Sequence, residues 1–142
     1  MKTIFKRIIF YILSFTWGGI TSWIGLLVIL FSLPFGRVFA YHGRLYAIWG
    51  NYWGGCELGC FFICGRFSKE HTLMHECGHG LQNCIWGPLF PIVIALPSAT
   101  RYWYRRLKRK HNPQVILTEY DSIWFEGQAT RWGEKYVQTD QI

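Results

Sequence analysis

Residues 75 to 79 form the sequence His-Glu-Cys-Gly-His, whose residue types and spacing can hold a zinc ion. On a helix, His75 and His79 lie on one face, so both imidazoles can reach a single ion. Glu76 lies one residue further round, close enough to take a proton from a water that zinc makes more acidic. We therefore predict His75 and His79 as zinc ligands and Glu76 as the general base. The alternative is a pair of surface histidines on an ordinary amphipathic helix.

A catalytic zinc site needs a third protein ligand and one open position. Glu126 opens the sequence Glu-Gly-Gln-Ala-Thr, whose small residues would let a helix here approach the first helix closely. We predict Glu126 as the third ligand, and a solvated helix carboxylate is the alternative. Three histidines in a row on one helix cannot easily converge on one ion, which argues against His71. The remaining candidates are His111, Glu119 and Asp121.

The predicted ligands carry a resemblance to a known family. Two histidines on one helix with a downstream glutamate resemble the gluzincin metalloproteases. Their membrane CAAX-protease-like branch has a Glu-x-x-Ala-Asp-x-x-Gly pattern, which Glu126, Ala129 and Gly133 match, with Thr130 in place of the aspartate. Residues 57 to 133 also resemble a group of small uncharacterised bacterial membrane proteins. The resemblance implies a zinc site and hydrolysis of a peptide bond, and it does not identify the substrate.

Composition and one long apolar run predict an integral membrane protein. Hydrophobic residues make up 51% of the 142 residues, and charged residues only 16%, against about a quarter in soluble domains. Ile8 to Leu33 has no charged residue over 26 positions, enough to span a bilayer and too long for a signal peptide. Gly18 and Gly19 would permit a bend in it. We expect a membrane segment at 1–36 and a zincin-like membrane domain at 37–142.

The rest of the chain is predicted to be mainly α-helical. A short strand is expected at 57–64, and a helix carrying the histidines is expected from an N-cap at Ser68 to about Ile85. Residues 85–100 are apolar but short and contain three prolines, so we expect a re-entrant or peripheral segment. A full crossing there would also separate the histidines from Glu126. The last helix, from Asp121 to about Gln138, would supply the third ligand.

The positive charge is concentrated in one segment that follows the apolar stretch. The chain has a net charge of +7, and such clusters usually contact anionic lipid head groups on the cytoplasmic face. We therefore expect a site facing the cytoplasm in a bacterial inner membrane. Nucleic-acid binding is disfavoured because no nucleic-acid fold motif accompanies the charges. The cluster comprises Arg101, Arg105, Arg106, Lys108, Arg109 and Lys110.

Five cysteines exclude a fully paired set of intrachain disulfides. Cys56, Cys60 and Cys64 would share one side of a helix or a strand. No Cys-x-x-Cys knuckle is present, so small residues packed in apolar surroundings are favoured over a cysteine zinc cluster. Cys77 lies two residues after His75 and is expected to point away from the ligand face.

These features together predict a membrane zinc metallopeptidase acting on a protein or peptide substrate at or near the membrane surface. Two alternatives stay open: a non-catalytic membrane protein with a structural or sensory zinc site, and a basic lipid-binding scaffold without metal. A structural site would be closed by four protein ligands. Candidate oxyanion stabilisers are Tyr120, Tyr136 and His111. A homo-oligomer is considered because so short a chain leaves little room for a substrate cleft.

Overall fold

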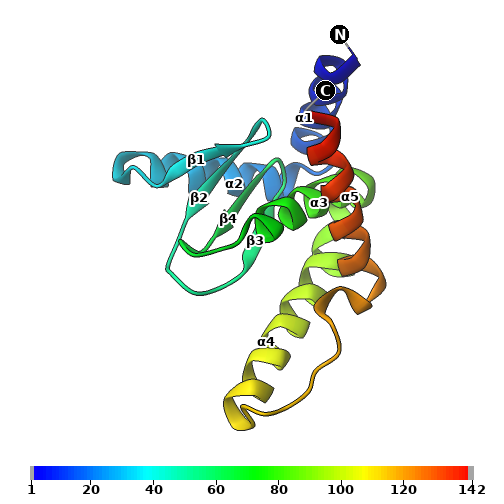
Figure 1. Ribbon diagram of the computed structural model, residues 1–142. Coiled ribbons are helices and arrows are strands. Elements are labelled where there is room, and N and C mark those ends of the chain that lie inside the picture. Colours follow the sequence, from blue (N-terminus) through cyan, green and yellow to red (C-terminus); the bar gives the residue numbers. More distant parts are fainter. Residues whose placement is uncertain (1, 141–142) are drawn as a thin grey trace.

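A four-stranded sheet occupies the first half of the chain, with α-helices packed around it (Figure 1). The computed structural model describes residues 2–140. The strand order is β1-β2-β4-β3; the two central strands are parallel and both outer pairs are antiparallel. Helix α2 passes behind the sheet and α3 in front of it. The strands are β1 (Val38–Tyr41), β2 (Arg44–Ile48), β3 (Gly55–Leu58) and β4 (Phe61–Cys64).

The sheet consists of two tight hairpins, whereas a single strand at 57–64 was predicted from the sequence. The predicted single strand at 57–64 is wrong, because the chain reverses at Gly59 to form the β3–β4 hairpin. Gly59 has φ +76°, a conformation that glycine adopts without steric cost. In the β1–β2 hairpin both turn residues, His42 and Gly43, have positive φ, as tight hairpin turns require. Short strands with mixed burial left little periodicity to recognise.

The N-terminal apolar run forms two helices with a sharp bend at Gly18 and Gly19, the position at which the sequence permitted one. Helix α1 (Lys2–Phe15) and helix α2 (Gly19–Ser32) meet at 98°. The bend packs against the middle of the chain, since the Trp17 indole donates a hydrogen bond to the carbonyl of Ile85 at 3.2 Å. Gly18 lies against the side-chain amide of Asn83, where a Cβ atom would collide.

Within residues 2–140, no individual helix combines the length and the apolar character needed to cross a bilayer. Two sharply bent helix pairs reach that length and composition jointly. One is the α1–α2 pair, and the other joins residues 70–89 to residues 91–111 at 118°.

Helix α3 (Glu70–Trp86) carries both histidines of the motif. Its predicted N-cap, Ser68, is wrong: the helix begins after Lys69, and no side chain caps it. The Ser68 hydroxyl instead donates to the carbonyls of Trp53 and Gly54, both at 3.2 Å, and thus ties the start of α3 to the loop before β3.

The helix ends where Gly87 and Pro88 were expected to end it, because Gly87 has φ +51° and proline cannot continue the ladder. A 3-10 turn (Gly87–Leu89) and a π-helical turn (Pro91–Ala95) then lead into α4 (Leu96–His111). Residues 85–100, predicted to be a re-entrant or peripheral segment, thus comprise the end of α3, these two turns and the first turn of α4. The helices on either side meet at 118°.

Helix α5 (Trp124–Asp140) follows a 3-10 turn (Tyr120–Ser122) and packs along α3, as Figure 1 shows. It begins three residues later than predicted. A Cβ on Gly78 of α3 would collide with the carbonyl of Ala129, and a Cβ on Gly133 of α5 would collide with the carbonyl of Met74. Each helix thus presents a glycine to the backbone of the other, which allows their axes to approach closely.

We predict that Gly78→Ala lowers the free energy of unfolding by about 1–3 kcal/mol, because the added methyl group must push α3 and α5 apart. Gly19→Ala is the matched control, since its Cβ would make only ordinary contact with Trp23. Thermal unfolding of the detergent-purified variants measures both effects. Equal melting temperatures for the two variants would contradict the packing account.

Candidate metal centre

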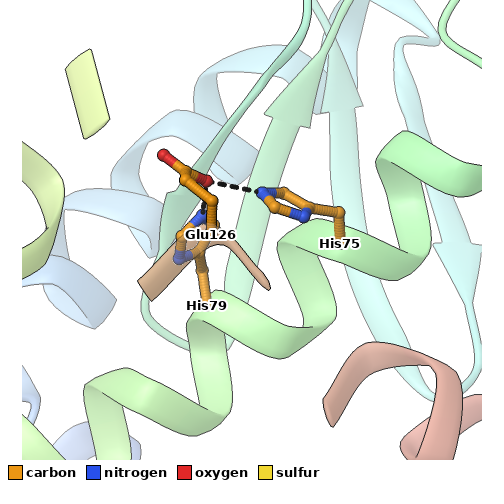
Figure 2. A group of neighbouring side chains, drawn as sticks. All are labelled: His75, His79 and Glu126. Carbon is orange, nitrogen blue, oxygen red and sulfur yellow. Dashed lines mark hydrogen bonds and ion pairs between the residues drawn. The ribbon is translucent and has the colours of Figure 1, made fainter. Parts of the chain in front are cut away.

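Three buried side chains from two helices converge on one point (Figure 2). His75 and His79 project from successive turns of α3, and Glu126 projects from the first turn of α5. The Nε2 atoms of the histidines lie 3.0 and 3.2 Å from the same Glu126 oxygen, Oε2. His75 is 7% exposed, His79 5% and Glu126 0%. The structure thus brings together the three predicted ligands, and their atoms lie within 4.8 Å of one another.

The far side of the His75 ring is held by a two-step hydrogen-bond relay. The Thr130 hydroxyl donates to Asp121 Oδ2 at 2.7 Å, so its oxygen is left to accept the proton of His75 Nδ1 at 2.8 Å. When the ring is neutral, this places the lone pair of His75 on Nε2, the atom that faces Glu126. The Asp121 carboxylate therefore orients His75 through the Thr130 hydroxyl. In the sequence, Thr130 was apparent only as a departure from the family pattern.

The His79 ring is held in the same sense by an amide. Both Gln82 Nε2 protons are used, one by the carbonyl of Phe125 at 2.8 Å and one by Gln128 Oε1 at 2.9 Å. Gln82 Oε1 must therefore accept from His79 Nδ1, at 2.7 Å. His79 Nε2 is again left as the atom with the free lone pair. Sequence analysis missed Gln82; its position three residues after His79, on the same helix face, was the available signal.

The charges around these atoms favour a bound cation. Burial alone would raise the pKa of Glu126, but hydrogen bonds from His75 and His79 hold it well below its usual range. Burial would lower the pKa of His79, yet its hydrogen bond to Glu126 and the nearby Glu76 raise it to about 9, and a cation that displaces the Nε2 proton would gain the lone pair of that nitrogen. The second Glu126 oxygen, Oε1, is buried without a hydrogen-bond partner. Two imidazole lone pairs and an unpartnered carboxylate oxygen are a donor set that fits a divalent metal ion.

Glu76 lies beside this group and faces a cavity of about 450 Å³. It is 5% exposed, and its carboxylate packs directly against Gly55, where a side chain would displace it. Burial raises the pKa of Glu76, while the two histidines oppose that shift. The cavity walls are formed mainly by apolar and aromatic side chains, including Trp53, Phe90, Ile94, Ala99, Tyr102 and Trp103.

A second carboxylate at this cavity was not predicted. Glu57 of β3 lines the cavity and is only 8% exposed. Its Oε1 accepts a hydrogen bond from the Gly59 backbone N–H at 2.5 Å, and its Oε2 has no hydrogen-bond partner. Burial raises the pKa of Glu57 well above its usual value. The hairpin that places Glu57 here was not apparent in the sequence.

The other residues singled out in the sequence lie outside the three-ligand group. His71 faces Asp121 at 3.8 Å, and Asp121 belongs to the relay behind His75. His111 ends α4, and Glu119 precedes the 3-10 turn. Cys77 is fully buried on α3 but is not one of the three grouped side chains.

Of the candidate oxyanion stabilisers, Tyr120 lines the cavity with its ring centroid 6.2 Å from that of His75. The Tyr136 hydroxyl instead donates to the His42 carbonyl at 2.8 Å, and His111 is at the end of α4. Tyr120 is therefore the candidate that the fold places at the metal centre.

The cysteines do not form the shared face that their spacing suggested. Cys56 is exposed on β3, whereas Cys60 and Cys64 are buried in and after the hairpin turn. Within residues 2–140, no disulfide joins any of the five cysteines. The preferred interpretation as small buried residues holds for Cys60 and Cys64.

We predict that Thr130→Val weakens zinc affinity by about 10- to 100-fold, because it breaks the relay that orients His75. Competition with a chromogenic chelator measures the affinity. Thr139→Val is the matched control, since the Thr139 hydroxyl bonds only the Lys135 carbonyl further along α5. Unchanged affinity in Thr130→Val would show that the relay does not support the ligand.

Comparison of the chain with protein-family models, with characterised proteins and with solved structures found no match in any of the three. The predicted family resemblance therefore has no support beyond the residues that suggested it. The finding that stands on the structure is a buried His75, His79 and Glu126 group, suited to a metal ion, on two closely packed helices.

Proposed function

We propose that this protein is a membrane-associated zinc metallopeptidase that hydrolyses a peptide bond at or near the membrane surface. One observation carries the proposal: the two histidines of a His-His-Glu group suited to one ion line a cavity together with a further buried glutamate, Glu76. A nucleophile-activating carboxylate beside a metal centre is the arrangement that metal-assisted hydrolysis needs.

The donor set favours zinc and favours catalysis over a structural role. Two imidazoles and one carboxylate are a common ligand set of catalytic zinc, whereas magnesium and calcium prefer oxygen ligands alone. Within residues 2–140, the grouped ligands number three, and a structural site would need a fourth. His75 and His79 both line the adjoining cavity, which leaves room for a substrate at the open position.

Glu76 and Tyr120 have separate roles in the proposed reaction, beside the three zinc ligands. When bound, zinc supplies a Lewis acid that polarises a carbonyl and makes water more acidic. Glu76 accepts the proton of the attacking water and returns it to the leaving nitrogen. Burial raises the pKa of Tyr120, so its phenol stays protonated and can donate to the developing oxyanion. The resemblance to gluzincins supports a peptide as the substrate.

Two surface features support a membrane location. Helices α1 and α2 expose a continuous series of large apolar side chains, which water alone would disfavour. Beyond the cavity, α4 carries the basic cluster, of which we propose that Lys108 and Lys110 contact anionic head groups at a bacterial inner membrane. The residues that line the cavity all belong to one chain, and a homo-oligomer stays a prediction. The exposed apolar side chains include Ile4, Phe5, Ile12, Ile20, Trp23, Leu27, Leu30 and Phe31.

We predict that Glu76→Gln keeps bound zinc but lowers peptide hydrolysis by at least about 100-fold, because the amide cannot accept the proton. Zinc-loaded protein in detergent is incubated with a mixture of synthetic peptides, and the products are quantified by mass spectrometry. Glu134→Gln, at an exposed position of α5, is the matched control. Full activity in Glu76→Gln would refute the assigned base. Zinc without hydrolysis in the wild type would favour the structural or sensory alternative.

A further inference from the structure

A second cavity, of about 440 Å³, adjoins the metal centre on the α4 side. Tyr102 and Tyr120 line both cavities, so the two share a wall. The remaining lining consists of Tyr52 and three arginines of α4, namely Arg105, Arg106 and Arg109. A substrate bound at the metal centre therefore passes close to a chamber whose charged groups are all cationic.

Two of the three arginines, Arg105 and Arg106, contact groups at the cavity walls, and Arg109 is exposed. Arg105 is 9% exposed, and its Nη1 donates to the carbonyl of Thr118 at 2.7 Å. Its guanidinium lies 5.5 Å from the centre of the Tyr120 ring. Arg106 Nη1 donates to the Tyr102 hydroxyl at 3.2 Å. Such fixed guanidinium groups suit the planar, paired recognition of a carboxylate or a phosphate.

The positive charge of this chamber is not balanced from within the described part of the chain. No aspartate or glutamate lines it, and within residues 2–140 Arg105 and Arg106 contact a carbonyl, a phenol hydroxyl and aromatic rings. Burial and the neighbouring charges of Arg101 and Arg109 lower the pKa of Arg105. An anion entering the chamber would relieve this repulsion.

The position of the chamber favours a substrate group over a lipid head group. Lys108 and Lys110 belong to the same basic cluster but do not line the chamber. The Lys108 ammonium lies over the Tyr104 ring, which lines neither cavity. Lys108 and Lys110 therefore remain available to a membrane surface. Arg105 instead contacts Thr118, in the segment that precedes Tyr120 and helix α5. Side chains of an extended peptide point alternately to opposite sides. A peptide bound alongside Tyr102 and Tyr120 would therefore place one side chain in each cavity.

We propose that the arginine chamber binds the carboxylate of an acidic residue in the peptide substrate and so directs cleavage to bonds near aspartate or glutamate. This inference rests on the proposed peptidase function. The proposed occupant of the chamber is a peptide. Binding of an anionic lipid head group there would be a result against the proposal.

The cleavage test compares two mixtures of synthetic peptides that are identical except for glutamate or glutamine at one fixed position. Zinc-loaded full-length protein in uncharged detergent is expected to cleave the glutamate mixture with a kcat/KM about tenfold higher, the size of a charged hydrogen bond. Arg109→Gln and Arg105→Gln should lose that preference, so that the ratio of kcat/KM between the glutamate and glutamine mixtures falls to about one in each variant. Lys110→Gln is the matched control and should keep the preference. An equal preference in all variants would overturn the proposal.

A binding test separates failure of this inference from failure of the peptidase function. Zinc-loaded Glu76→Gln protein is equilibrated with both mixtures, and bound peptides are quantified by mass spectrometry. Retention of the glutamate mixture, lost on adding Arg109→Gln, supports the chamber even if no peptide is hydrolysed. Equal retention of both mixtures overturns it. Loss of binding to phosphatidylglycerol vesicles in Arg109→Gln, with peptide preference intact, would assign the chamber to lipid and also overturn it.

Discussion

The close contact between α3 and α5 is the constraint on which the candidate site depends. The histidines and Glu126 lie 47 and 51 residues apart in sequence, so local structure cannot bring them together. Gly78 and Gly133 let the two backbones meet without intervening side chains. The same contact carries Gln82 to Phe125 and Thr130 to His75. The ligands and the groups that orient them are therefore set by one interface.

The sheet and the bends in the chain have a supporting role in this arrangement. The β3–β4 hairpin lies against α3 and supplies Glu57 and the flat Gly55 surface behind Glu76. The 118° turn after α3 brings α4 back over the cavity and thereby closes it on the side away from the sheet. Since a metal-assisted hydrolysis gains from an apolar, partly enclosed cavity, these elements complete what the two helices begin.

Sequence reasoning predicted the features that have a short local signature. The i, i+4 histidines, the helix end at Gly87–Pro88 and the small residues after Glu126 each follow from spacing or backbone chemistry. The hairpins were not predicted, because their strands are four or five residues long and lack clear alternation. Gly18 and Gly19 indicated where α1 and α2 could bend, but the sharpness of the bend and its contact with Ile85 involve the tertiary fold, which a hydropathy run cannot reveal. The relay to Asp121 likewise depends on the tertiary fold.

The central claim is that His75, His79 and Glu126 bind one metal ion, and metal content tests it most directly. The account predicts about one zinc ion per chain in detergent-purified wild type, lost in both His75→Ala and Glu126→Ala. Loss of zinc in His75→Ala but not in Glu126→Ala would show that the third ligand is a residue other than Glu126. Well-folded wild type that takes up no metal when zinc is supplied would contradict the account.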